Sequence, residues 1–157
     1  MIDTYTTTGM AEAVFVDSGA FIALALRQDQ HHEAAKQFWN ELSFGVRRMT
    51  TSSVVGETFT FLRRKVGYGS AYDFLNTVAR SEARNTILTI WPDHSWTSQI
   101  NLILGRYSDQ NLSYTDAVSL VACQLQPNIG SIFSFDHHLG VTGLILAPGP
   151  RQNKRKT

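Results

Sequence analysis

The sequence predicts one α/β domain, in which a central parallel sheet is covered by helices on both faces. Short apolar segments rich in β-branched and aromatic residues alternate along the chain with longer segments whose apolar residues recur at helical spacing. The apolar segments contain few polar residues, as expected for strands that are buried on both faces of a sheet. A chain of 157 residues, 43% of them hydrophobic, is long enough to bury such a core.

The first half of the chain supplies two predicted strands and four predicted helices. The apolar run Ala13-Val14-Phe15-Val16 predicts the first buried strand. Residues 51–53 are suitable N-caps for a helix that continues to Lys65, and Gly67 and Gly69 separate this helix from the next one. The expected elements are a strand over 13–16, helices over 18–27 and 31–42, a weaker strand over 46–50 that two arginines interrupt, and helices over 51–65 and 70–83.

The second half follows the same alternation. A β-branched, apolar run predicts a strand that Pro92 ends. Trp96, Ile100 and Ile103 lie on one side of the helix that follows, and Pro127 ends the last helix. The expected elements are a strand over 86–91, helices over 93–107 and 113–126, and strands over 131–135 and 144–146.

The two ends of the chain differ from the middle in composition. We expect a polar extension over 1–11, the domain over 12–147 and a basic tail over 148–157, since four of the 14 basic residues lie in the last seven positions. A basic tail can bind a polyanion, and a solvated end is an equally good explanation.

The sequence favours a cytoplasmic protein. It begins without the basic and apolar segments of a signal peptide. No apolar run reaches the ~18 residues of a membrane span. The one cysteine, Cys123, lies in an apolar helix, where we expect an inert buried thiol in a reducing compartment.

Four of the 13 acidic residues lie at the edges of predicted elements. Asp17 follows the first strand, and Asp136 follows the strand over 131–135. Glu57 and Asp116 lie near the beginnings of two helices. In an open parallel sheet, the carboxyl ends of the strands and the beginnings of the following helices meet at one rim, where sites form. We therefore expect these four carboxylates to converge.

Each of the four also has a structural explanation. Asp17 suits the N-cap of the helix after it, Ser113 and Asp116 have the spacing of a capping box, and Asp136 can close an Asx-turn. Glu57 can be a solvated helix residue. Carboxylates ~5 Å apart repel by about 3 kcal/mol per pair at an effective dielectric constant of about 20. A cluster of four is therefore unfavourable unless cations or protons offset the repulsion, and Mg²⁺ and Mn²⁺ prefer carboxylate oxygens.

Hydroxyl and imidazole groups lie next to these acids. Three hydroxyls can orient metal-bound water, although helix capping explains Ser18 equally well; they are Ser18, Thr115 and Ser134. The pair His31-His32 begins a helix and is expected at the surface. The pair His137-His138 follows Asp136, but its spacing is not that of a zinc site.

The segments around the four acids resemble the acidic motifs of PIN-domain ribonucleases, and most closely those of VapC-type toxins from prokaryotic toxin–antitoxin pairs. The resemblance covers about residues 12–147, in which the order and spacing of the motifs agree, while Leu139 stands where such domains often carry Phe. The motifs are Val14-Phe15-Val16-Asp17-Ser18, Ser53-Val54-Val55-Gly56-Glu57, Tyr114-Thr115-Asp116-Ala117 and Phe133-Ser134-Phe135-Asp136-His137-His138-Leu139.

This resemblance implies a three-layer α/β/α PIN-like fold and an endoribonuclease that hydrolyses RNA phosphodiester bonds with Mg²⁺ or Mn²⁺. It implies that Asp17, Glu57, Asp116 and Asp136 are catalytic, and that Asp17, Asp116 and Asp136 are metal ligands. It also implies a homodimer and inhibition by a small antitoxin protein. Basic residues that can hold RNA phosphates, although solvated surfaces explain them as well, are Arg47, Arg48, Arg63, Arg64 and Lys65.

Other classes fit the sequence less well. Haloacid-dehalogenase-like phosphatases need Asp-x-Asp after the first strand, where this chain has Asp17-Ser18-Gly19. Receiver domains need a second acid there and a lysine near the last strands, and neither is present. The remaining alternative is a non-catalytic PIN-like module that binds RNA or protein. Such a module would tolerate the loss of an acid, and all four are present.

Overall fold

The computed structural model describes residues 12–148, which form a three-layer α/β/α domain. Five parallel strands form the central sheet in the order β3-β2-β1-β4-β5. The fold class predicted from the sequence is thereby confirmed. The expected N-terminal extension over 1–11 and most of the expected basic tail lie outside the described residues.

The strands and helices follow the predicted order with shifted ends. The strands are β1 (Ala13–Val16), β2 (Arg47–Thr51), β3 (Ile87–Ile90), β4 (Ile129–Ser134) and β5 (Ile145–Pro148). The α-helices are α1 (Ser18–Ala25), α2 (His32–Glu41), α3 (Ser52–Lys65), α4 (Tyr68–Ala83), α5 (Thr97–Arg106) and α6 (Tyr114–Leu125). Two 3₁₀ helices are η1 (His94–Trp96) and η2 (His137–Thr142).

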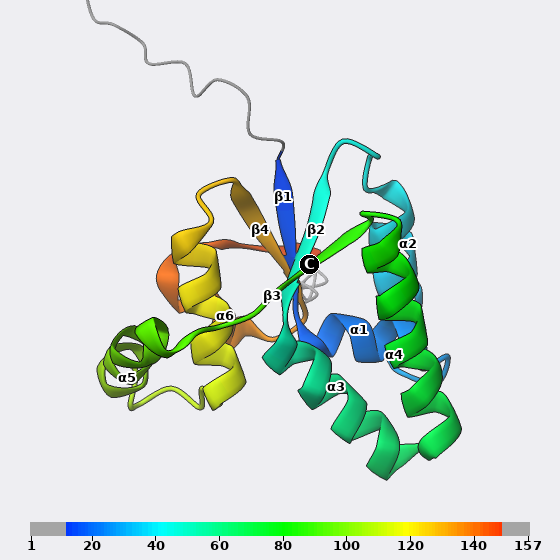
Figure 1. Ribbon diagram of the computed structural model, residues 1–157, viewed down its shortest axis with the longest axis horizontal. Coiled ribbons are helices and arrows are strands. Elements are labelled where there is room, and N and C mark those ends of the chain that lie inside the picture. Colours follow the sequence, from blue (N-terminus) through cyan, green and yellow to red (C-terminus); the bar gives the residue numbers. More distant parts are fainter. Residues whose placement is uncertain (1–11, 149–157) are drawn as a thin grey trace, which may run out of the picture.

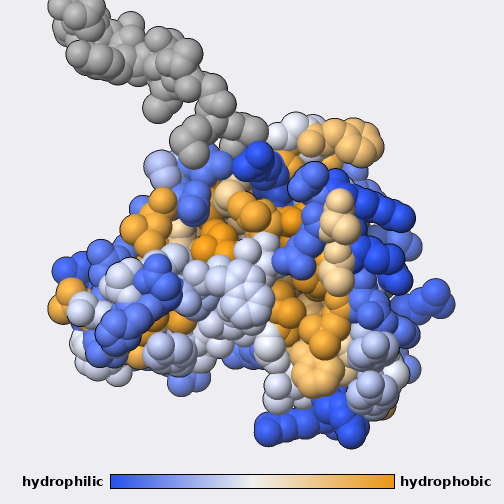
Figure 2. All heavy atoms as spheres, in the orientation of Figure 1, coloured by the Kyte–Doolittle hydropathy of each residue, from blue (hydrophilic) through white to orange (hydrophobic). Residues whose placement is uncertain are grey.

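Helices cover the sheet on both sides. Helices α1, α2 and α4 lie on one side of the strands in Figure 1, and α5 and α6 lie on the other. Helix α3 begins directly after β2 at the carboxyl end of the sheet, where it packs against α1, α4 and α6. In Figure 2, apolar residues also reach the surface in the middle of the face that is shown. Leu88 of the edge strand β3 and Trp91 beyond it are among the exposed apolar side chains.

The two central strands form the most buried part of the core. Every residue of β1 is buried, and β4 contributes the fully buried Ile132 and Phe133. The ring of Phe133 lies 4.6 Å from that of Phe38 on α2, measured between centroids. Burying aromatic side chains of this size supplies a large part of the hydrophobic stabilisation of a domain. The loops at the carboxyl ends of β1 and β4 are therefore held by rigid elements.

Among the shifted element ends, two have a clear local cause and a third concerns the basic tail. The helix predicted over 93–107 begins as the 3₁₀ helix η1, because the Asp93 carboxylate accepts a hydrogen bond from the backbone N–H of Ser95. Helix α4 begins at Tyr68, since Gly67, with φ of 139°, makes the turn after α3. Strand β5 extends to Pro148, the residue at which the basic tail was expected to begin.

The strand order places a topological switch point between β1 and β4. The chain moves from β1 outward through β2 and β3, and then returns to β4 on the other side of β1. In open α/β sheets, ligands bind at such a topological switch point, beyond the carboxyl ends of the strands. Asp17 follows β1 and Asp136 lies just past β4, so both acids lie at this point.

Candidate active site

Asp17 is a buried carboxylate at the carboxyl end of β1. Its side chain is 4% exposed, and its backbone N–H donates to the carbonyl of Phe133 on β4. The hydroxyl of Ser134 donates to Asp17 Oδ2 over 3.0 Å. Asp17 Oδ1 is buried and has no hydrogen-bond partner among residues 12–148. An unpaired buried carboxylate oxygen is costly, and a bound cation would satisfy it.

The surroundings of Asp17 favour its neutral form. The pKa of this carboxyl is raised to about 6, mainly by burial and to a smaller extent by the carboxylates of Asp116 and Glu57. The backbone amide of Ser18 and the hydroxyl of Ser134 act in the opposite direction. The sequence left open whether Asp17 caps α1. The structure places Asp17 at the N-cap position, but its side chain makes no capping hydrogen bond in the described part of the chain.

Asp116 lies in the first turn of α6 and has a double role. Its carboxylate accepts from the backbone N–H of Ser113 over 2.8 Å, and the Ser113 hydroxyl accepts from the Asp116 N–H, which completes the predicted capping box. Burial raises the pKa of Asp116, the charge of Asp136 raises it further, and His138 opposes this effect. The capping role therefore coexists with proximity to Asp17, Asp136 and His138.

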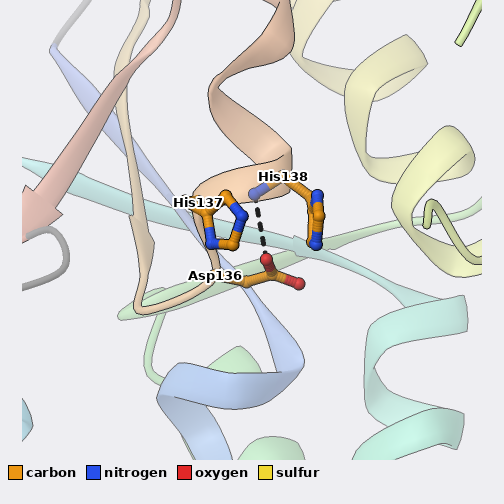
Figure 3. A group of neighbouring side chains, drawn as sticks. All are labelled: Asp136, His137 and His138. Atoms are coloured by element: carbon orange, nitrogen blue, oxygen red, sulfur yellow. Dashed lines mark hydrogen bonds between the residues drawn. The ribbon is translucent and has the colours of Figure 1, made fainter. Parts of the chain in front are cut away.

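Ser134 connects the first and fourth acids. Its hydroxyl donates to Asp17 and accepts from the backbone N–H of Asp136 over 3.0 Å. The Asp136 carboxylate in turn accepts from the backbone N–H of His138 over 2.9 Å, as an Asx-turn at the beginning of η2 (Figure 3). One hydroxyl at the end of β4 thus fixes two acids that belong to different strand ends.

Glu57 reaches the same rim from α3. It is half-buried one and a half turns into the helix, and its charge contributes to the raised pKa of Asp17. A groove of about 440 Å³ begins at Glu57 and Thr115 and continues along α3 to Arg64 and Lys65. Glu57 is therefore accessible from the side of α3, and the basic residues Arg64 and Lys65 line the same groove.

The four acids predicted from the sequence therefore lie in one electrostatically coupled group. Asp17 interacts with Asp116 and Glu57, and Asp116 interacts with Asp136. Of the three hydroxyls expected beside the acids, Ser134 contacts Asp17 directly and Thr115 lines the groove. Ser18 acts on Asp17 through its backbone amide.

The predicted basic residues divide into two groups. Arg63, Arg64 and Lys65 form the last turn of α3. Arg47 and Arg48 lie at the amino end of β2, level with Ala13 and Val14 of β1, at the opposite end of the sheet from the acids. The Arg48 guanidinium lies over the Trp39 ring, 5.0 Å from its centroid, and donates to two backbone carbonyls. Packing thus accounts for Arg48 without any ligand.

Sequence reasoning gave His138 no role at the site. The structure places its charge close enough to Asp116 to affect the pKa of that carboxyl, and its Nδ1 is buried without a hydrogen-bond partner in the described part of the chain. The only signal in the sequence was its position two residues after Asp136.

The donors at the rim fit a hard divalent cation. They are carboxylate oxygens from Asp17, Asp116 and Asp136, with Glu57 nearby, and one oxygen of Asp17 is buried without a partner among residues 12–148. Mg²⁺ and Mn²⁺ prefer such oxygen donors, and their charge would remove the repulsion among the acids.

Comparison with known proteins agrees with this geometry. Residues 14–143 match the PIN domain family. The 23S rRNA-specific endonuclease VapC20 of Mycobacterium tuberculosis, in strains CDC 1551 and H37Rv, is 29% identical to this chain over 136 residues, which are 84% of this chain and 95% of that protein. The crystal structure of M. tuberculosis VapC20, described as a sarcin-ricin loop cleaving toxin, matches with a TM-score of 0.74 and 25% identity, over 84% of this chain and 96% of that one.

Proposed function

Because the chain belongs to the PIN domain family, we propose that it is a divalent-metal-dependent endoribonuclease and the toxin of a toxin–antitoxin pair. The observation that carries the metal site is the buried Asp17 carboxylate, one oxygen of which has no partner among the described residues. Its pKa is raised by burial and by two further carboxylates. A folded protein tolerates such a cluster best when it binds a cation.

The four acids differ in how they would coordinate a Mg²⁺ or Mn²⁺ ion. We assign the direct ligands to Asp17, Asp116 and Asp136, and Glu57 acts directly or through a water molecule. When bound, such an ion neutralises the carboxylates and acts as a Lewis acid toward water and a phosphodiester. Ser134 keeps Asp17 and the Asp136 backbone in fixed positions through its two hydrogen bonds. The capping box at Ser113 fixes Asp116 in the same way.

The groove along α3 offers RNA a path to Glu57, one of the four acids. Glu57 and Thr115 line its inner end, and Arg64 and Lys65 line its outer end. Eight helical steps lead from Glu57 to Lys65, which corresponds to about 12 Å along α3. Arg63 lies over the Tyr68 ring, 5.7 Å from its centroid, at the same end of α3. Arg47 and Arg48 lie at the other end of the sheet, so an RNA strand in this groove would not need them.

The relatives suggest a substrate class. VapC20 is named as a 23S rRNA-specific endonuclease and as a toxin that cleaves the sarcin-ricin loop. For this chain we propose only the same class of substrate, a structured RNA. The sarcin-ricin loop is included among the substrates to be tested. We also propose an antitoxin that inserts a cationic side chain among the acids, where it would compete with metal and RNA. A homodimer in the cytoplasm is part of the same proposal, and none of the described helices is long and apolar enough to cross a membrane.

The second candidate is a PIN-like module that binds RNA or protein without cleaving it. Such a module would have no need for Asp17, whose buried charge is unfavourable in the absence of a cation. The convergence of the four acids therefore favours an enzyme.

The proposed function is tested by RNA cleavage with the purified protein. Asp116→Asn should lower kcat/KM by at least about 100-fold in millimolar Mg²⁺ or Mn²⁺, since an amide oxygen carries no net charge to hold a hard cation. The control is Asp73→Asn, which removes an exposed carboxylate on α4 and should leave cleavage unchanged. Substrates are an RNA hairpin with the sarcin-ricin sequence and an unstructured RNA of equal length. Unaltered cleavage by Asp116→Asn, or undiminished cleavage of both RNAs in EDTA, would exclude the proposed mechanism.

A further inference from the structure

A second, chemically different group of ligands lies at the edge of the acidic site. Asp136, His137 and His138 each offer a ligand atom, and these atoms all lie within 4.8 Å of one another (Figure 3). The backbone hydrogen bond from His138 uses Oδ1, one of the two oxygens of the Asp136 carboxylate. His137 is exposed and the other two residues are half-buried, so a cation from solution can reach all three.

The two imidazoles share one side of the turn. Their ring centroids lie 4.1 Å apart at an interplanar angle of 37°. The Nδ1 atom of His138 is buried and lacks a hydrogen-bond partner within the described part of the chain. The hydrogen bonds of the described residues therefore do not occupy this ring nitrogen, and the His138 imidazole offers one of its two nitrogens to the group. The exposed His137 ring can rotate to shorten the spacing to that of a bound ion.

The chemistry of these donors differs from that of the four acids. Two imidazoles and one carboxylate suit Zn²⁺ and the other late first-row divalent ions, whereas Mg²⁺ and Mn²⁺ prefer oxygen donors. Sites with three protein ligands and an open fourth position are typical of zinc when it remains accessible to solvent. This group borders the acidic site, because Asp136 belongs to both.

We propose that Asp136, His137 and His138 form a binding site for Zn²⁺ and that Zn²⁺ bound there inhibits the nuclease. The inhibition follows because Asp136 belongs to both groups of ligands. A Zn²⁺ ion held by Asp136 and the imidazoles withdraws this carboxylate from the acids and adds positive charge beside Asp116. The inhibitory half rests on the proposed nuclease function, and the binding half stands on the three side chains alone.

Binding is tested with Co²⁺, which replaces Zn²⁺ and absorbs visible light when imidazoles coordinate it. The full, untagged chain is titrated with Co²⁺ in excess Mg²⁺. We expect one Co²⁺ per chain and loss of the absorption when Zn²⁺ is added. His137→Gln and His138→Gln should each weaken Co²⁺ binding at least about tenfold. His94→Gln is the matched control, because His94 is also exposed and also follows an aspartate, Asp93.

The variants separate this site from the site of the four acids. Asp17→Asn should retain the Co²⁺ absorption, because Asp17 is not one of the three ligands. If Asp17→Asn loses the absorption while His137→Gln keeps the affinity of the unmutated chain, the cation binds among the acids and the proposal is wrong. Because His137 is exposed, His137→Gln gives a valid result even if His138→Gln does not fold.

Inhibition is measured separately, as the Zn²⁺ concentration that halves each variant's own rate of RNA cleavage in Mg²⁺. His137→Gln should raise this concentration at least about tenfold, and His94→Gln should not change it. Equal sensitivity of His137→Gln and the unmutated chain would overturn the inhibitory half. A chain that binds Co²⁺ through the histidines but never cleaves RNA would leave the site intact and refute the nuclease function instead.

Discussion

Replacing Asp17 with asparagine should change the pH dependence of stability of the metal-free protein. The pKa of Asp17 is raised from 3.8 to about 6 in the folded state, first by burial and then by Asp116 and Glu57. The folded protein therefore binds this proton more tightly than the unfolded chain does. The stabilisation is complete below pH 3.8 and is lost as the pH rises through 6. The Asp17→Asn variant has no charge to titrate at this position, so it lacks this loss.

The size of the effect follows from the shift. A difference of about 2 pKa units corresponds to about 3 kcal/mol between pH 3 and pH 8. The Asp17→Asn substitution also places an amide NH₂ near the position of the unpaired Oδ1, which costs about 1–3 kcal/mol at every pH. The variant should therefore be less stable than the unmutated chain at acid pH and equal or more stable above pH 7. At about 2–4 °C per kcal/mol, the difference in Tm between the two proteins should change by roughly 6–12 °C over this range.

The measurement is thermal or urea unfolding in EDTA at several pH values, with Asp73→Asn as the exposed control. Mn²⁺ should raise the Tm of the unmutated chain by mass action, and the rise should be smaller in Asp17→Asn. If the stability difference between the unmutated chain and Asp17→Asn does not change with pH, then folding does not raise the pKa of the Asp17 carboxyl. That result would also remove the main physical argument for a cation at this position.

Three further predictions concern other parts of the site. Ser134→Ala should lower the free energy of unfolding by about 2–3 kcal/mol and slow cleavage, because the Asp17 carboxylate and the Asp136 N–H both lose a partner; urea unfolding and kcat measure the two effects. The double substitution Arg64→Ala and Lys65→Ala should raise KM in cleavage assays, and it should reduce the salt dependence of RNA binding in filter-binding assays by about 1.4 in log–log slope. Arg47→Ala should change neither quantity. Burial raises the pKa of the Cys123 thiol to about 12, so this thiol should react with maleimide only at the rate of unfolding, and fast labelling of the native protein would contradict its burial.

The fold could be predicted because local signals and burial agree along most of the chain. The apolar run 13–16 is completely buried as β1, and Thr51 caps α3 as expected, since its hydroxyl accepts from the Val54 N–H. The convergence of the four acids followed from parallel topology alone. The element ends were missed where a single side chain or an unusual backbone angle decides them, as at Asp93 and Gly67.

Other features of the site depend on contacts in space that the hydrophobic pattern of the sequence does not reveal. The sequence could not show that Ser134 bridges two acids, because its partner Asp17 lies 117 residues away. It could not distinguish Arg48, packed over Trp39, from Arg64 beside the groove. The spacing of His137 and His138 in the sequence is not that of a known zinc motif. These adjacent histidines come close to Asp136 only because of the way the chain turns at η2.

The strand order has a consequence for synthesis of the protein on the ribosome. Strand β1 pairs with β4, so the surroundings of Asp17 are completed by residues near the other end of the domain. A nascent chain emerges from its N-terminus and lacks β4 until most of the domain has been made. An unfinished chain therefore has Asp17 without Asp136, and under the proposed mechanism it would not cleave the RNA around it. If the chain is a toxin, its translating ribosome is protected from it until β4 docks, and an antitoxin that is already present has that interval in which to meet it.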